Sequence, residues 1–283
     1  MLRKFQQIDI FGATAYTGNP LAVVLDGEGL STEEMQNFSR WTNLSESTFL
    51  LPPTQQGADY RVRIFTPACE LPFAGQPTLG SCHAWLSSGG KPRGKDVVVQ
   101  ECGAGLVRLK RGAERLAFAA PPLLRSGPVE DAFVGEIADV LRIARKEIVD
   151  AQWADNGPGW VAVLLKDAAA VLAVEPDFSR YSGKASLNIG LVGPYPKGSR
   201  CAFEVRALFA DEQRQMREDP VTGSLNASLA QWLLSTGRAE APYVTSQGTR
   251  LGRVGRPHVD EDADGTVWIG GATVTCIEGE IEI

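Results

Sequence analysis

The sequence has few of the residues that metal sites and disulfide frameworks require. Its only two histidines, His83 and His258, lie far apart, which argues against a histidine-rich metal site. The five cysteines are odd in number and scattered, at positions 69, 82, 102, 201 and 276, and no Cys-x-x-Cys pair occurs. We therefore expect free thiols in a reducing cytoplasm and no resident metal.

Other absences argue against whole classes of function. No segment approaches the ~18 consecutive apolar residues of a membrane helix, and the N-terminal MLRKFQQIDIFG contains no signal-peptide run. The 28 basic and 34 acidic residues give a formal net charge of −6, so nucleic acid is not an expected partner. No glycine-rich dinucleotide signature follows a strand. The sequence predicts a cytoplasmic protein without a membrane or nucleic-acid partner.

The segments that are present predict an α+β protein. Strand-like sequence is frequent, as in YRVRIF (60–65), DVVVQE, RLAFAA, GWVAVLL, CAFEVRALF, TVWIGG and ATVTCIEGEIEI. Helix-like sequence is expected at 31–41, 77–88, 129–142 and 223–237. The first of these has a capping box, Ser31 with Glu34, and an apolar stripe of Met35, Phe38 and Trp41. Strands outnumber helices without strict alternation, which favours α+β over a doubly wound fold.

An internal repeat indicates two similar halves. PTLGSCHAWL (77–86) and PVTGSLNASL (220–229) share a pattern at an offset of 143, and YRVRIF lies over FEVRAL (203–208) at the same offset. This alignment matches Asp219 with Gln76, Gly223 with Gly80, and Ser224 with Ser81. We place the halves at residues 1–122 and 123–271, separated by the proline-rich AAPPLLRSGP, with 272–283 as a strand that could complete the first half.

In such a duplication the two loop–helix junctions are expected to face a cleft between the halves, where small ligands usually bind. Helix N-termini there would suit an anionic ligand, most simply a carboxylate. The same residues are also consistent with a purely structural interpretation. Gly80 and Asp219 could serve only to shape and cap helices, and Glu46 could be a solvated residue at a strand entrance.

Four longer motifs resemble the PhzF-type isomerase family of phenazine biosynthesis, which is related in fold to diaminopimelate epimerase and proline racemase. They are, in order, TGNPLAVVLDGEGLS, NLSESTFLLPP, YRVRIFTPACELPFAGQPTLG and EDPVTGSLNASL. The resemblance implies two similar domains, each a curved mixed sheet or barrel around a central helix, with the active site between them. It also implies a homodimer, no cofactor and a small carboxylic-acid substrate.

The resemblance also suggests roles for individual residues. Glu46 falls on the family's general acid/base, and Asp219 falls on a second catalytic position. The positions implied for substrate binding are Asn19, Ser45, Gly75, Gln76, Thr78, Gly80, Thr222, Gly223 and Ser224. Gln76 departs from the family pattern, which has histidine there, and glutamine cannot carry a proton at neutral pH. The repeated loops also lack the paired cysteines of two-thiol racemases.

These observations predict a cofactor-independent isomerase or epimerase that moves a proton on a small acid by carboxylate acid/base catalysis. The alternative is a non-catalytic anion-binding or interaction protein on the same fold, which the departure at Gln76 supports. The segment DEDADG (260–265) has calcium-loop spacing but Gly271 at the position of the essential glutamate, so we interpret it as a polar turn.

Overall fold

The chain divides into two compact units. The computed structural model describes residues 1–112, 115–183, 186–210 and 215–283. Unit 1 comprises Met1–Ala119 and Trp268–Ile283, and unit 2 comprises Ala120–Val267. These bounds differ by a few residues from the expected 1–122 and 123–271, and the last strand is part of unit 1.

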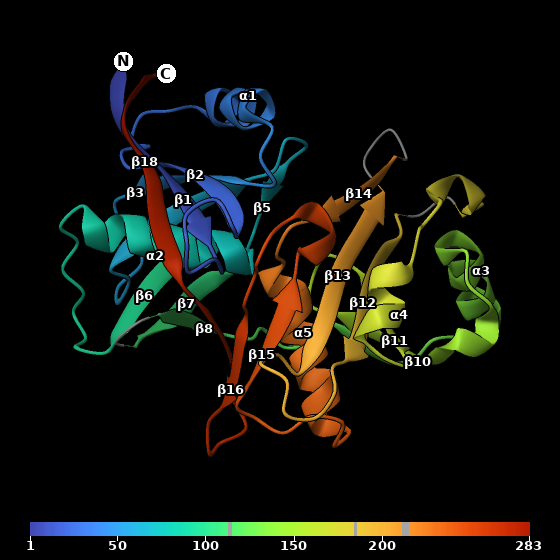
Figure 1. Ribbon diagram of the computed structural model, residues 1–283. Coiled ribbons are helices and arrows are strands. Elements are labelled where there is room, and N and C mark those ends of the chain that lie inside the picture. Colours follow the sequence, from blue (N-terminus) through green and yellow to red (C-terminus); the bar gives the residue numbers. More distant parts are fainter. Residues whose placement is uncertain (113–114, 184–185, 211–214) are drawn as a thin grey trace. The chain divides into compact units, whose positions relative to one another are not determined.

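Unit 1 is a curved mixed sheet (Figure 1), and its described residues include two α-helices. Its strands are β1 (Leu2–Ile10), β2 (Asn19–Val24), β3 (Ser47–Leu51), β4 (Tyr60–Phe65), β5 (Glu70–Leu71), β6 (Val97–Cys102), β7 (Gly105–Arg111), β8 (Leu116–Ala119), β17 (Val267–Gly271) and β18 (Thr273–Glu282). They pair in the order β18–β1–β2–β3–β4–β6–β7–β8–β17, and β5 also pairs with β4. The β2–β3 and β4–β6 pairs are parallel.

The helix α2 (Gly75–Ser87) is the central helix of unit 1. It contacts strands from across the sheet, namely β1, β2, β3, β4, β6, β8 and β18. Glycine is needed where the helix meets the sheet, because a Cβ on Gly80 would lie 2.6 Å from Leu21 Cδ2 and 2.9 Å from Ile10 Cδ1. This arrangement confirms the expected α+β fold with a curved sheet around a central helix.

The other helix of unit 1, α1 (Thr32–Thr42), has the predicted capping box: Glu34 N donates to Ser31 Oγ and Ser31 N donates to a Glu34 carboxylate oxygen. The predicted apolar stripe is only partly correct. Met35 is buried and Phe38 packs beside it, but Trp41 is 84% exposed. Each three-residue step falls about 60° short of a full helical turn, so Trp41 has rotated away from the sheet.

Unit 2 is a second mixed sheet, with three α-helices among the residues that the structure describes. Its strands are β9 (Arg125–Pro128), β10 (Ile148–Asp155), β11 (Trp160–Leu165), β12 (Asn188–Pro194), β13 (Phe203–Ala210), β14 (Met216–Asp219), β15 (Tyr243–Gln247) and β16 (His258–Glu261), and its helices are α3 (Asp131–Leu141), α4 (Ala168–Ala173) and α5 (Gly223–Ser235). The strands pair in the order β9–β10–β11–β12–β13–β15–β16, and β14 also pairs with β13. The short helix α4 was not predicted.

The middle strands of the unit 2 sheet are buried on both faces, and β11 shows this most clearly. Its alternate residues Val161 and Val163 belong to an apolar cluster with α3 and α4, whereas Trp160 and Ala162 belong to a cluster with α5. A strand covered on both faces is expected to be apolar throughout, as WVAVLL is.

The same strand order occurs in both units, which confirms the predicted pseudo-symmetry. The strands β1–β2–β3–β4–β6–β7 and β10–β11–β12–β13–β15–β16 are linked by the same succession of pairs: antiparallel, parallel, antiparallel, parallel and antiparallel. In each unit a short strand, β5 or β14, folds back on the middle strand and leads into a 13-residue helix, α2 or α5.

The two hairpins that precede these helices differ in length. Four residues lie between Phe65 and its paired Glu70, whereas nine lie between Leu208 and its paired Glu218. The middle strands therefore match at the expected offset of 143, but the short strands β5 and β14 and the helices α2 and α5 match at 148, the difference between positions 218 and 70.

With the offset of 148 the first helical residues, Gly75 and Gly223, coincide, and Gln76 falls on Ser224. The matches expected from the offset of 143 along the helices, among them Asp219 with Gln76, are therefore wrong. The longer hairpin in unit 2 contains five additional residues, so an alignment without gaps matches the middle strands correctly but misaligns the helices that follow.

Two smaller expectations can also be checked. Residues 262–265 form a turn between β16 and β17, closed by a hydrogen bond from Gly265 N to Asp262 O, which confirms the polar turn predicted for DEDADG. Within the described ranges, no helix is both long and apolar enough to cross a membrane.

Candidate active site

The first site element of unit 1 is the loop between β1 and β2, which Asp9 holds in place. Asp9 is buried, and its Oδ2 accepts hydrogen bonds from Thr17 N at 2.7 Å and Gly18 N at 2.8 Å. The next residue, Asn19, starts β2, and its carbonyl oxygen accepts a 3.1 Å hydrogen bond from Gln76 Nε2. The structure thus brings Asn19 and Gln76 together.

The side chain of Gln76 is held in place by burial and by one hydrogen bond. Its side chain is almost fully buried, and the amide nitrogen binds the Asn19 loop. The amide oxygen is buried and has no hydrogen-bond partner among the residues that the structure describes. The glutamine therefore fastens α2 to the loop before β2.

Glu46 and Ser45 lie directly before β3, in the connection from α1. Helix α1 ends at Thr42 and is followed by its C-cap Asn43, which takes a left-handed conformation with φ of 54°. Both Ser45 and Glu46 are half-buried. The strand that follows is tied to α2, because Ser81 Oγ donates to Thr48 Oγ1 at 3.0 Å. Glu46 is therefore placed by the end of one helix and the start of a core strand.

The remaining predicted residues of unit 1 are on α2. Gly75 is the first residue of the helix and packs on Phe118, because a Cβ there would lie 2.3 Å from Phe118 Cζ. Thr78 is fully buried and accepts a 3.0 Å hydrogen bond from Gln100 Nε2. Gly80 lies in the second turn against the sheet, so we assign it a packing role.

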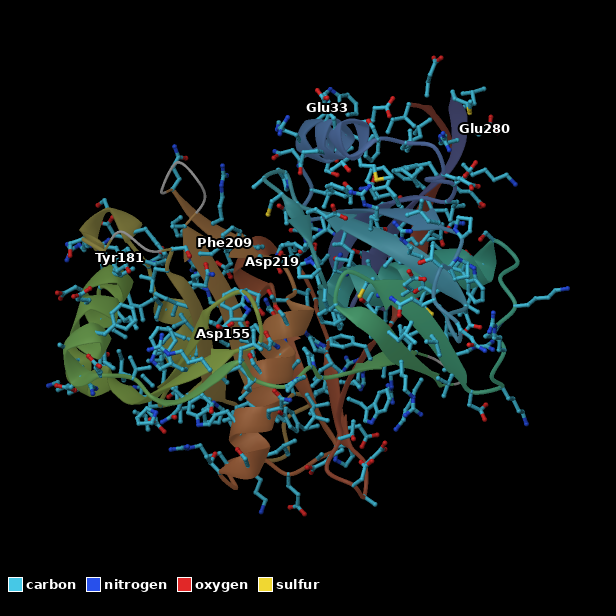
Figure 2. All side chains as sticks on the ribbon, turned by 180° about the vertical axis from the view of Figure 1, so that it is seen from behind. Glu33, Asp155, Tyr181, Phe209, Asp219 and Glu280 are labelled. Carbon is cyan, nitrogen blue, oxygen red and sulfur yellow. The ribbon has the colours of Figure 1, made fainter. Side chains whose placement is uncertain are left out.

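The predicted residues of unit 2 lie at the end of β14 and the start of α5, where Figure 2 labels Asp219. Thr222 precedes the helix, but its hydroxyl donates to Asp219 Oδ2 at 2.6 Å and does not cap the helix. Ser224 Oγ accepts a 3.1 Å hydrogen bond from Trp160 Nε1. Asp219, Thr222, Gly223 and Ser224 are thus gathered at one turn.

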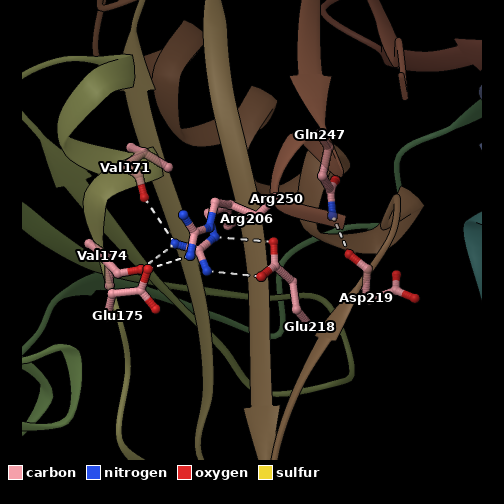
Figure 3. A network of polar contacts seen from close by, with 8 residues as sticks. All are labelled: Val171, Val174, Glu175, Arg206, Glu218, Asp219, Gln247 and Arg250. Carbon is pink, nitrogen blue, oxygen red and sulfur yellow. Dashed lines mark hydrogen bonds and ion pairs between the residues drawn. The ribbon is translucent and has the colours of Figure 1, made fainter. Parts of the chain in front are cut away.

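Glu218, the other acid of the EDP motif, has a separate partner. It forms a bidentate ion pair with Arg206 (Figure 3). Arg206 Nε donates to Glu218 Oε1 at 3.1 Å and Nη2 donates to Oε2 at 2.9 Å, and both side chains are buried. Arg206 Nη1 also donates to the carbonyl oxygens of Val171 and Val174 at the end of α4. The carboxylate of Glu218 is committed to this pair.

Unit 1 contains the same ion pair at the equivalent position. Arg63 donates to Glu70 from Nε at 2.7 Å and from Nη2 at 2.6 Å, and these hydrogen bonds raise the pKa of Arg63. Arg63 and Arg206 match at the strand offset of 143, and the glutamates match at 148. An arginine–glutamate ion pair thus stabilises each of the two hairpins that precede α2 and α5.

Residues that the sequence motifs did not single out complete the unit 2 site. Gln247, at the end of β15, is fully buried, and its Oε1 accepts hydrogen bonds from Thr222 N at 3.0 Å and Asn226 Nδ2 at 2.7 Å. Its Nε2 donates to Thr222 Oγ1 at 2.9 Å and to Asp219 O at 3.3 Å. Gln247 lies outside the four motifs that carry the family resemblance, and no local sequence pattern indicated this contact.

No metal-binding cluster of three or more His, Cys, Asp or Glu side chains occurs in the described part of the chain. The side chains gathered in the two units can donate and accept hydrogen bonds and, at Glu46 and Asp219, exchange protons. They offer the groups needed for acid/base chemistry.

Comparison with known proteins identifies the family of the chain. A model of the phenazine biosynthesis-like (PhzC-PhzF) protein family matches residues 8–279. The chain belongs to the phenazine biosynthesis-like protein family. The chain is 36% identical to "Antisense-enhancing sequence 1" of Schizosaccharomyces pombe, over 98% of each chain. It is 30% identical to the trans-2,3-dihydro-3-hydroxyanthranilate isomerase of Pseudomonas aeruginosa, over 93% of this chain and 92% of that one.

Solved structures share the fold of this family member. A phenazine biosynthesis protein of the PhzF family from Bacillus anthracis has a TM-score of 0.81 and 21% identity, over all of both chains. A hydroxyproline epimerase from Agrobacterium vitis has a TM-score of 0.58 and 15% identity, over 99% of this chain and 91% of that one. The fold is therefore shared by PhzF-like and proline racemase-like proteins.

Proposed function

We propose that this protein is a cofactor-independent isomerase or epimerase that moves a proton on a small carboxylic acid. The observation that carries the proposal is the pair of equivalent helix starts, Gly75 of α2 and Gly223 of α5. Neither N-cap side chain, Ala74 or Thr222, accepts a hydrogen bond from its helix. The first N–H groups of a helix have no partner within it and favour an anion.

In this proposal the substrate carboxylate binds at these helix starts, in a cleft between the two units, and Glu46 removes a proton from carbon and returns it. Asp219 is the second acid/base group, and Thr222, Gly223 and Ser224 bind the substrate beside it. Support comes from the 30% identity to a protein named as an isomerase of trans-2,3-dihydro-3-hydroxyanthranilate, itself a small carboxylic acid. We further propose that the protein acts as a homodimer.

Asn19, Ser45 and Gln76 would form the unit 1 side of the site. Because the Gln76 amide is engaged with the Asn19 loop and cannot carry a proton, the proposal assigns it the placement of that loop. Proton transfer is then left to the two carboxylates. Catalysis by positioned acid/base groups contributes typically about 10²–10⁴-fold in rate.

Solvent-deuterium incorporation tests the proposal. A panel of small amino, hydroxy and cyclic unsaturated acids is incubated in D₂O with the wild type and with Glu46→Gln, and exchange is followed by NMR. Exchange with the wild type should fall by about 10²-fold or more in Glu46→Gln. The matched control is Glu33→Gln, which removes the same charge from an exposed position on α1 and should leave exchange unchanged.

The result also decides between catalysis and binding. Exchange that persists at full rate in Glu46→Gln would remove Glu46 from the mechanism. A folded wild-type protein that binds an acid of the panel, but exchanges none, would favour the non-catalytic anion-binding protein. The position of Gln76, where the family pattern has histidine, is the observation that favours this second function.

A further inference from the structure

Four hydrogen bonds form a chain that ends on the carboxylate of Asp219. Thr245 Oγ1 donates to Asn226 Oδ1 at 2.6 Å, and Asn226 Nδ2 donates to Gln247 Oε1 at 2.7 Å. Gln247 Nε2 then donates to Thr222 Oγ1 at 2.9 Å, and the Thr222 hydroxyl donates to Asp219 Oδ2 at 2.6 Å. Thr245, Asn226 and Gln247 are all buried.

The backbone fixes the direction of this chain. The Gln247 amide lies between Thr222 N–H, which can only donate, and the Asp219 carbonyl, which can only accept. Its oxygen must therefore face the first and its nitrogen the second, as Figure 3 shows for the contact with Asp219. The same nitrogen supplies a proton to Thr222 Oγ1, so the hydroxyl proton of Thr222 is directed to Asp219.

Gln247 also holds both ends of the turn that carries the site. It binds the backbone of Asp219 and of Thr222, the residues that flank the turn before α5. A chain of bonds that all run in one direction is strengthened by mutual polarisation in a buried setting. A fully buried amide with all its bonds made resists reorientation, because any other orientation would leave buried groups unpaired.

We propose that Gln247 is a positioning residue that acts through Thr222 to aim and hold the Asp219 carboxylate. The inference rests on the proposed function, in which Asp219 is an acid/base group. Gln247 itself is not a catalytic residue, because its contacts are to the turn and to Asn226. Its effect is to set which Asp219 oxygen carries the Thr222 hydrogen bond and, through that bond, the orientation of the carboxylate.

The sharpest test is Gln247→Glu, which keeps the shape of the side chain and removes its two donors. The new carboxylate would accept the Thr222 hydroxyl proton and draw it away from Asp219. We expect kcat for solvent exchange to fall by about a hundredfold, as for a displaced catalytic group, while KM changes little. A fall in kcat with no change in KM separates positioning from loss of substrate binding.

Gln6→Glu is the matched control. Gln6 is also buried, and its amide nitrogen faces a carboxylate, Glu278, but it lies in unit 1 on β1. This variant should keep wild-type exchange. In addition, Gln247→Glu and Thr222→Val should be non-additive, because both cut the same chain. Additive losses would overturn the claim that Gln247 acts through Thr222.

A readout without substrate separates this inference from the proposed function. The carboxyl ¹³C resonance of Asp219, assigned with Asp219→Asn, should shift at fixed neutral pH in Gln247→Glu and stay in place in Gln6→Glu. If the resonance shifts but the wild type catalyses no exchange, the positioning role stands and the proposed function fails. If the resonance does not move in folded Gln247→Glu, the inference is overturned.

Discussion

Arg206 and Arg63 form equivalent ion pairs that differ in burial, and we expect these pairs to contribute differently to stability. Each makes a two-pronged ion pair with a glutamate of its hairpin, but side-chain exposures are 3% and 7% for Arg206–Glu218 and 19% and 39% for Arg63–Glu70. Removing one partner of a buried pair leaves an uncompensated charge, at a cost of about 3–5 kcal/mol, whereas an exposed pair contributes about 0–1 kcal/mol.

We therefore expect Arg206→Met to lower the free energy of unfolding by about 3–5 kcal/mol and Arg63→Met by about 1 kcal/mol or less, measured by urea denaturation. The double variant Arg206→Met/Glu218→Met, which removes both charges, should recover most of the loss. Equal losses for Arg206→Met and Arg63→Met would show that burial does not govern these pairs.

At the scale of elements, local sequence patterns predicted what depends on neighbouring residues. The capping box of α1 and the polar turn at 262–265 need only residues within one turn, and both were found where the sequence indicated. The central helix and the paired halves also followed from motif and repeat. The equivalence of Gln76 with Ser224 did not, because it depends on how each hairpin pairs.

The site residues divide in the same way. Asp219 and Glu46 lie within recognisable motifs, whereas Gln247 reaches the site from a strand more than twenty residues further along the chain. Asp9 is similar, since its role depends on a loop folding back onto β1. A buried polar side chain shows its purpose only when the groups that it satisfies are brought to it by the fold.

The contact between α2 and β18 makes a pH-dependent prediction. His83 on α2 has Thr273 Oγ1 and Thr275 Oγ1 within 2.8 Å of its two ring nitrogens, and burial lowers the pKa of His83 below its usual 6.5. The unfolded chain then takes up this proton at a higher pH than the folded one. Neutral, buried His83 therefore contributes fully to the free energy of unfolding only well above pH 6.5. This contribution is lost as the pH falls through 6.5 toward the lower pKa of His83 in the folded protein.

We expect the free energy of unfolding to decrease between about pH 7.5 and about pH 5.5, and to decrease less steeply in His83→Gln, when both are followed by urea denaturation. The variant separates this group from the carboxylates that titrate at lower pH. Identical pH dependence in the two proteins would show that His83 does not contribute.

For the whole molecule, the division into units predicts which pieces can fold. Unit 2 is continuous in sequence and has apolar clusters on both faces of its sheet. Unit 1 is interrupted, because β18 pairs along the whole of β1 and β17 pairs with β8. A fragment of residues 1–119 would therefore lack two strands of its sheet and the partners of His83.

The interruption can be removed without disturbing unit 1. Ala120 N donates to Val267 O at 2.8 Å, directly beyond the paired Ala119 and Trp268. Replacing residues 121–266 by Asn-Gly would join these strands through a two-residue hairpin, the connection that suits the strand twist best.

We expect this joined unit 1 and the fragment 120–267 each to unfold cooperatively in urea, followed by circular dichroism, and 1–119 to be unfolded. If 1–119 folds as stably as the joined chain, β17 and β18 are additions to unit 1, not part of its core. If the joined chain fails to fold while the full-length protein does, unit 1 depends on unit 2 for its stability.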